Sequence, residues 1–203
     1  MMSRRTSTRA AVLLLAAVPV LAACGGGGGG GNTVADEAKN PGQARWTAGD
    51  GQAAIIPAAQ RRDPVKLTGT TLDGEPWSMA DQAGQVVVLN VWSSTCNPCK
   101  TEMPALQAMW ADLQARKQPV RFIGVNRFDS VENALADVRT FGLTYPSLAN
   151  DGGRALLALQ GQAGALPTTL IIDRQGRIAA KYGGAIEAST LKALIEDAVA
   201  EDA

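Results

Sequence analysis

The sequence contains no histidine and only three cysteines among its 203 residues. Without histidine, neither a Ser-His-Asp nor a Cys-His catalytic group can form, and a histidine-ligated metal site is excluded. An excess of charge is also missing, because 19 basic residues balance 19 acidic ones. Non-specific nucleic-acid binding needs a strong basic excess, so the composition argues against that class of function. Three cysteines are too few for a disulfide scaffold, and each therefore needs its own explanation.

The N-terminal region is typical of a secretory signal. Three arginines precede an apolar stretch over residues 10–23, which is too short to span a bilayer but fits the apolar part of a signal peptide. The stretch ends in Leu21-Ala-Ala-Cys24, which resembles the bacterial lipobox, a signal in which the cysteine is lipidated and becomes the new N-terminus. We therefore predict a lipoprotein signal peptide over residues 1–23 and a lipid on Cys24. A chance cysteine and a buried N-terminal helix are the alternatives.

A glycine-rich segment follows Cys24. Seven consecutive glycines, Gly25–Gly31, lead into polar sequence without periodicity. Such a chain behaves as a flexible coil. We predict that residues 24–59 form a lipidated flexible tether and that residues 60–203 form one folded domain. Removal of residues 1–23 leaves 16 basic against 19 acidic residues, so membrane attachment would depend on the lipid rather than on positive charge.

From about residue 60 the hydrophobic pattern alternates between strand and helix periods. The segment 85–92 is a nearly continuous β-branched run, which is typical of a strand buried on both faces. The order of elements predicts an α/β sandwich with helices on both faces of a mixed sheet. The expected strands cover residues 65–71, 85–92, 120–125, 168–172 and 178–182, and the expected helices cover residues 97–116, 130–141, 155–159 and 187–200.

The remaining two cysteines form a C-x-x-C motif, Cys96-Asn-Pro-Cys99, between the buried strand and a helix. A cysteine at a helix N-terminus faces the positive end of the helix dipole and unpaired backbone N–H groups, which favour the thiolate. Two cysteines three residues apart on a helix lie on one face and can close a disulfide. The motif therefore predicts a redox pair.

Three other interpretations of the motif were weighed. A structural zinc site would need two more ligands, and only Cys24 is left. A copper-binding loop would need exposed Met or His neighbours, which are not adjacent. A purely structural disulfide is possible in an oxidising compartment, but a four-residue loop constrains little chain entropy.

The motif and its surroundings resemble the TlpA/ResA-like thiol-disulfide oxidoreductases, a membrane-tethered branch of the thioredoxin superfamily. The strand 87–92, the C-x-x-C and the segment 102–106 carry the resemblance in the first half, and Gly164–Asp173 carries it in the second. The match extends from about Leu67 to the C-terminus. It implies a thioredoxin-like fold, with a central mixed sheet, helices on both faces and an N-terminal β-hairpin extension.

The resemblance also implies roles for four residues. Cys96 would be the attacking thiol and Cys99 the resolving thiol. Pro167 matches the cis-proline beside the cysteine pair, for which an ordinary trans proline is the alternative. Glu102 matches a buried glutamate that adjusts the proton chemistry of the cysteines, since a desolvated carboxylate has a raised pKa. The alternative for Glu102 is a solvated acid that complements the helix dipole.

One position departs from the family pattern. Thr95 stands where relatives usually carry a tryptophan before the first cysteine, so the apolar surface that contacts partners is altered.

Family context implies a monomeric enzyme, outside the cytoplasm and lipid-anchored to the cell membrane. It would reduce disulfides of exported proteins such as apocytochrome c. Electrons would come from a membrane thiol donor, and no cofactor, metal or nucleic acid is implied. A thiol-dependent peroxidase, of the AhpC/TSA-like antioxidant type, is one alternative. A non-enzymatic solute-binding or scaffold lipoprotein is the second.

Overall fold

The computed structural model describes residues 53–201. The predictions for the signal peptide, for Cys24 and for the tether before residue 53 lie outside the described residues. Within residues 53–201, no helix is both long enough and apolar enough to cross a membrane.

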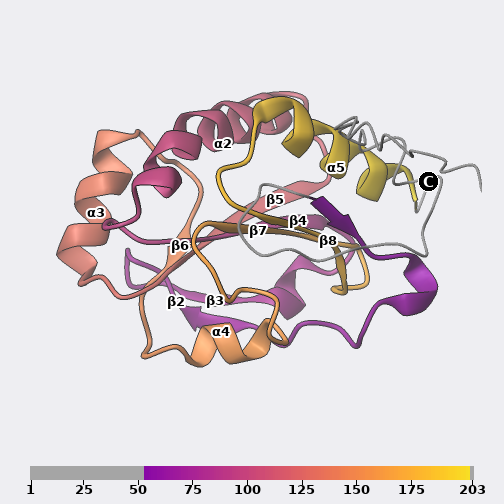
Figure 1. The fold of residues 1–203 in the computed structure, drawn as a ribbon, viewed down its shortest axis with the longest axis horizontal. Helices are drawn as coiled ribbons and strands as arrows, with labels where there is room; N and C mark the ends of the chain where they lie inside the picture. Colours follow the sequence, from indigo (N-terminus) through magenta and orange to yellow (C-terminus); the bar gives the residue numbers. More distant parts are fainter. Residues whose placement is uncertain (1–52, 202–203) are drawn as a thin grey trace, which may run out of the picture. The chain divides into compact units, whose positions relative to one another are not determined.

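A mixed β-sheet forms the centre of the described part. Its strands are β1 (Ala53–Ile55), β4 (Val86–Trp92), β5 (Val120–Asn126), β6 (Ser147–Leu148), β7 (Thr168–Ile172) and β8 (Ile178–Gly183). They follow the order β1-β8-β7-β4-β5-β6 across the sheet (Figure 1). β4 pairs in parallel with β5 and antiparallel with β7. All seven residues of β4 are buried, which confirms the prediction of a central strand covered on both faces.

Helices cover both faces of this sheet. They are α2 (Asn97–Ala115), α3 (Val131–Thr140), α4 (Arg154–Ala158) and α5 (Ala188–Ala200), with short 3-10 turns η1 (Ala58–Gln60) and η2 (Met79–Gln82). A separate hairpin consists of β2 (Thr68–Thr70) and β3 (Pro76–Ser78). Helices α2 and α5 lie above the sheet in Figure 1, whereas α4 and the hairpin lie below it. The predicted α/β sandwich with an N-terminal hairpin is confirmed.

Alternation along β4 divides the interior into two cores. Val86, Val88 and Trp92 pack with α2, α3 and α5. Val87, Leu89 and Val91 face the opposite way and pack with the hairpin and α4. Because successive side chains of a strand point to opposite faces, one apolar strand supplies both cores.

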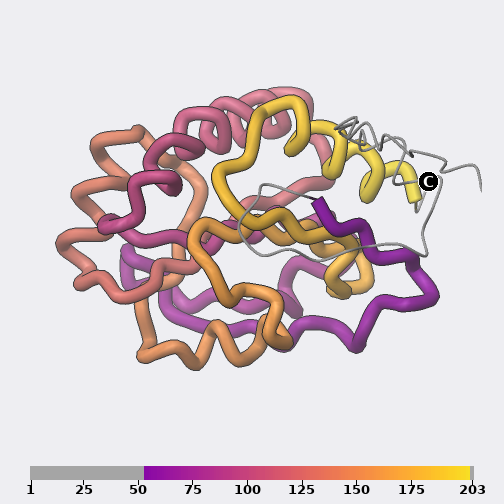
Figure 2. The backbone as a smooth tube through the Cα atoms, in the orientation of Figure 1, coloured from indigo at the N-terminus to yellow at the C-terminus, as the bar shows by residue number. Residues whose placement is uncertain are grey.

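The folded region begins earlier than the sequence indicated. The predicted tether ran to residue 59, but Ala53–Ile55 form strand β1, which pairs antiparallel with Ala180–Tyr182 of β8. Three residues carry too short a pattern for strand periodicity to be recognised. After β1 the chain passes around the end of the sheet and returns beneath it to enter β2 (Figure 2).

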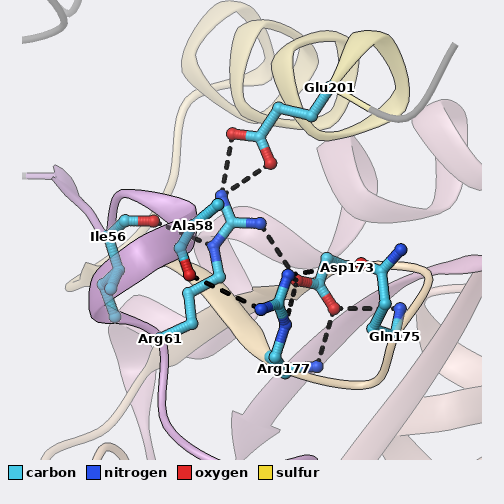
Figure 3. Close-up of polar contacts among 7 residues, drawn as sticks. All are labelled: Ile56, Ala58, Arg61, Asp173, Gln175, Arg177 and Glu201. Atoms are coloured by element: carbon cyan, nitrogen blue, oxygen red, sulfur yellow. Dashed lines mark hydrogen bonds and ion pairs between the residues drawn. The ribbon is translucent and has the colours of Figure 1, made fainter.

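A buried ion-pair cluster fixes this N-terminal segment to the rest of the fold. Asp173, at the end of β7, receives hydrogen bonds of 3.0 Å from both Arg61 Nη1 and Arg177 Nε. Arg61 also donates from Nη2 to Glu201 and from Nε to the carbonyl of Ile56 (Figure 3). The side chains of Asp173 and Arg61 are 0% and 2% exposed. The cluster therefore joins η1, the β7–β8 turn and the end of α5.

Candidate active site

The cysteine pair lies at the junction of β4 and α2. Cys96 is the N-cap of α2, and its sulfur accepts a hydrogen bond of 3.2 Å from the backbone N–H of Cys99. The two residues form a disulfide, with their Cα atoms 5.3 Å apart. Cys99 is completely buried and Cys96 is half-buried. Cys96 is therefore the sulfur that an incoming disulfide can reach, and the helix N-terminus favours its negative charge.

Glu102 lies one helical turn beyond Cys99 and is almost fully buried, with 2% of its surface exposed. Its Oε1 accepts a hydrogen bond of 2.7 Å from Asn90 Nδ2, and its Oε2 accepts one of 2.8 Å from the backbone N–H of Ile186. Burial outweighs these two bonds and raises the pKa of Glu102 to about 7. This carboxyl can hold or release a proton near neutral pH. The solvated position considered as the alternative is wrong.

Glu102 also has a buried aromatic neighbour. Burial first, and the charge of Glu102 second, raise the pKa of the Tyr145 hydroxyl well above its usual range. Asn90 Nδ2 additionally donates to Thr169 Oγ1 at 3.2 Å, so the amide joins β4, α2 and β7. The carboxyl is thus held by groups from several elements, which fixes its position one helical turn after Cys99.

The proline loop lies at the same edge of the sheet. Thr168 pairs with Val91, near the end of β4, so the residue before Thr168 lies beside the β4–α2 junction. The Leu166–Pro167 peptide bond is cis, as the resemblance implied, and Pro167 is buried. Its carbonyl accepts a hydrogen bond of 2.9 Å from the N–H of Gly184, in the loop after β8.

Asp129 is a site residue that the sequence did not single out. It lies in the loop after β5 and accepts hydrogen bonds from Ser94 N at 2.6 Å, Ser94 Oγ at 2.7 Å and Ser93 Oγ at 3.1 Å. Asn126 Nδ2 donates a fourth bond at 2.6 Å. Burial alone would raise the pKa of Asp129, but the hydrogen bonds outweigh it and hold the pKa below its usual value.

These contacts organise the residues before Cys96. Ser93 Oγ also lies 3.0 Å from Thr95 Oγ1, and the carbonyl of Ser93 accepts the N–H of Cys96 at 3.1 Å. Ser93 and Ser94 are therefore bound directly to Asp129, and Thr95 is linked to it through Ser93. A Ser-Ser-Thr run directly before a C-x-x-C, with an aspartate after the next strand, is the only sequence signal that could have found this arrangement.

No group of three or more Cys, Asp or Glu side chains within residues 53–201 is placed to hold a metal ion.

A redox-active cysteine pair at a helix N-terminus, beside a cis-proline loop on a mixed sheet, defines a thioredoxin-like thiol-disulfide oxidoreductase. The chain belongs to the AhpC/TSA family, whose sequence profile matches residues 62–181. Within the thioredoxin superfamily it is ResA-like, and the resemblance to that branch is confirmed.

Curated relatives support this assignment. The chain is 31% identical over 125 residues to the thiol-disulfide oxidoreductase ResA of Geobacillus thermodenitrificans, covering 62% of this chain and 70% of that protein. It is 37% identical over 111 residues to the thioredoxin-like protein YneN of Bacillus subtilis, covering 53% of this chain and 62% of YneN.

A solved structure shows the same fold. A secreted thiol-disulfide isomerase from Corynebacterium glutamicum superimposes with a TM-score of 0.68 at 28% sequence identity, over 76% of this chain and 96% of the other. The predicted fold class and enzyme class are therefore both confirmed.

Proposed function

We propose that this thiol-disulfide oxidoreductase reduces disulfides of exported proteins from a site tethered to the outer side of the cell membrane. The observation that carries the proposal is the asymmetry of the pair, because Cys96 is partly exposed at the helix N-terminus whereas Cys99 is fully buried. An exposed attacking sulfur with a buried partner suits a two-step exchange with a large substrate. The disulfide-bearing protein substrate is called the client below.

In the first step the thiolate of Cys96 attacks one sulfur of the client disulfide. A Cys96–client mixed disulfide forms, and the second client sulfur leaves as a thiolate that takes up a proton. In the second step the thiolate of Cys99 attacks the sulfur of Cys96 and releases the first client sulfur. Two electrons pass from the dithiol to the client, and the disulfide Cys96–Cys99 remains. A dithiol donor must reduce this disulfide again, and we assign that role to a membrane thiol carrier.

Glu102 supplies the proton chemistry of the second step in this proposal. Cys99 is buried and must lose its proton before it attacks, but the chain has no histidine to accept that proton. A carboxyl with a pKa of about 7, one helical turn away, can exchange protons at the pH where the reaction proceeds. Pro167, on the adjacent loop, would present the backbone of Leu166 to an extended client segment.

The sequence supports the place of action and the nature of the client. The predicted signal peptide and lipidated Cys24 would hold the enzyme outside the cytoplasm, where oxidised exported proteins occur. The similar C. glutamicum protein is described as secreted. Apocytochrome c, whose cysteines must be reduced before haem attachment, is the client that the resemblance to the ResA-like branch suggests.

The experiment uses the full chain in its native membrane with Cys99→Ser. This variant should accumulate mixed disulfides through Cys96, because the resolving thiol is missing. The double variant Cys96→Ser/Cys99→Ser is the matched control and should trap nothing. If no partner is trapped and the wild type reduces no insulin disulfide, the proposal is wrong. The trapped partners also identify the client, and apocytochrome c should be among them.

A thiol-dependent peroxidase is the second candidate, favoured by the AhpC/TSA profile match. It predicts that the reduced wild type consumes hydrogen peroxide with a thiol donor, and that Cys96→Ser abolishes this consumption. A scaffold lipoprotein predicts instead that Cys96→Ser retains full function in the cell.

A further inference from the structure

Phe128 is a large aromatic side chain that the fold leaves exposed beside the redox site. It is 67% exposed, and Val131, three residues later, is 41% exposed. Within residues 53–201 only one other large apolar residue, Leu157 on α4, is exposed to this degree. Two of the three exposed large apolar residues therefore lie three positions apart, Phe128 in the loop between β5 and α3 and Val131 at the first position of α3.

The backbone of Phe128 is also unfavourable. Its φ of 75° lies in the left-handed region, which glycine and asparagine adopt readily and which costs a bulky aromatic residue on the order of 1 kcal/mol or more. A residue that is both strained and exposed contributes little to folding stability. The stability of the fold therefore does not explain a phenylalanine at this position.

The loop that carries Phe128, residues 127–130, is bonded to the two other loops of the site, namely the residues just before Cys96 and the proline loop. On one side, Asp129 binds the backbone and side chain of Ser94, two residues before Cys96. On the other side, the Arg127 Nη1 atom reaches the carbonyl of Gly164, at the start of the proline loop, at 3.5 Å. The backbone N–H of Arg127 also donates to the carbonyl of Trp92, the last residue of β4, at 2.9 Å. The loop therefore lies at the sheet edge that carries the cysteine pair.

Arg127 also orients the aromatic ring. The guanidinium carbon lies 4.3 Å from the ring centroid of Phe128, a cation–π contact that restrains a side chain otherwise surrounded by solvent. A ring restrained in this way loses little conformational entropy when it binds a partner.

We propose that Phe128 is the apolar contact that docks the disulfide-bearing segment of a client protein beside Cys96. The inference rests on the proposed function and specifies its client, namely a polypeptide with an apolar side chain next to the attacked cysteine. Thr95, directly before Cys96, is exposed and offers no large apolar surface, so the aromatic side chain from the neighbouring loop supplies the apolar contact.

The test compares a protein disulfide with a small one. Reduced full-length wild type and Phe128→Asn are assayed with insulin and with hydroxyethyl disulfide, which has no polypeptide segment to dock. Asparagine tolerates the left-handed backbone, so the variant should be at least as stable to urea as the wild type. The ratio of kcat/KM for insulin to kcat/KM for hydroxyethyl disulfide should fall about tenfold, mainly through KM for insulin.

Two controls make the result specific. Phe128→Tyr keeps the aromatic ring and should restore the ratio. Leu157→Asn removes an exposed apolar residue from α4, on the opposite face of the sheet from α2, and should leave the ratio at its wild-type value. An unchanged ratio in Phe128→Asn, with both disulfides reduced by the wild type, would overturn the docking role alone. A wild type that reduces neither disulfide would overturn the proposed function and the docking role with it.

Discussion

Asn90 Nδ2 donates a hydrogen bond of 2.7 Å to Glu102 Oε1, and this contact joins the central strand β4 to the helix that carries both cysteines. The amide cannot exchange a proton, so of these two side chains only Glu102 can take up or release one. Because the carboxyl is buried, its charged form lacks hydration and is stabilised only by Asn90 and the N–H of Ile186.

Glu102→Gln should change how stability depends on pH. The pKa of Glu102 is about 7 when folded, against an ordinary value of 4.5. Between these values the folded state binds more protons than the unfolded state, so stability falls as pH rises from about 4.5 to about 7. The expected loss from this group is about 3 kcal/mol in the wild type and is absent in the variant. Urea unfolding of the oxidised protein, whose cysteines do not titrate, measures the difference.

The matched control for this measurement is Glu75→Gln, which removes an exposed carboxyl from the β2–β3 hairpin. Its stability should follow the wild-type pH curve. The slope to compare is that of the free energy of unfolding against pH, between pH 5 and pH 7. If this slope in Glu102→Gln equals that in Glu75→Gln and in the wild type, the raised pKa of Glu102 is wrong.

Asp129→Asn should slow the reaction with every disulfide. The variant keeps one acceptor oxygen where the carboxylate serves Ser93, Ser94 and Asn126, so the residues before Cys96 lose part of their support. We expect a loss of about 1 kcal/mol of folding free energy and a fall in kcat of about tenfold. Insulin and hydroxyethyl disulfide should be affected alike, in contrast to the selective effect expected for Phe128→Asn.

The contribution of the Asp129 carboxylate to folding stability depends on pH with the opposite sign from that of Glu102. The folded pKa of Asp129 is lowered below 3.8, so its contribution is fully present above that pH and is lost as the pH falls through the folded value. The stability difference between wild type and Asp129→Asn should therefore shrink on acidification. A difference that persists undiminished in strong acid would show that the carboxylate charge is not responsible.

The predictable and the unpredictable parts of the site differ in how far their contacts reach along the chain. Cys96 and Cys99 could be assigned because helix N-terminal geometry follows from adjacent residues. Glu102 was assigned through the resemblance to the family, which implies a buried glutamate at this place on the same helix. Asp129 was not singled out, because its partner Ser94 is 35 residues earlier and is brought near only by the parallel pairing of β4 with β5. Sequence periodicity carries no information about such cross-loop bonds.

The elements of the fold show the same division. The long strand β4 and helix α2 have clear patterns and lie where the sequence predicted them. Strands β1 and β6, of three and two residues, exist only because a neighbouring strand offers a free edge. The left-handed backbone of Phe128 was equally invisible, since phenylalanine disfavours that conformation and tertiary contacts of Arg127 and Asp129 impose it.

Arg61→Ala should destabilise the fold through the buried ion-pair cluster. Removing the guanidinium leaves the carboxylate of Asp173 buried with only Arg177 and backbone N–H groups as partners (Figure 3). We expect a loss of about 3 kcal/mol, because breaking a buried pair leaves uncompensated charge. Arg116→Ala, which breaks an exposed pair with Asp112, is the control and should cost less than about 1 kcal/mol. Equal effects in urea unfolding would contradict the structural role of the cluster.

Gly124→Ala should destabilise the fold, although alanine loses less conformational entropy than glycine when the chain folds. A Cβ atom at Gly124 would lie 2.9 Å from both Trp92 Nε1 and Ser147 Cβ. Trp92 is buried and donates from Nε1 to Ser147 Oγ at 2.8 Å, so neither side chain can move without breaking that bond. Overpacking of this kind costs about 2 kcal/mol. Thermal unfolding of Gly124→Ala should show a lowered Tm.

Gly164→Ala, where the added methyl meets nothing within 4 Å, is the control and should unfold like the wild type. Similar Tm values for both variants would mean that β5 and β6 separate easily at this point.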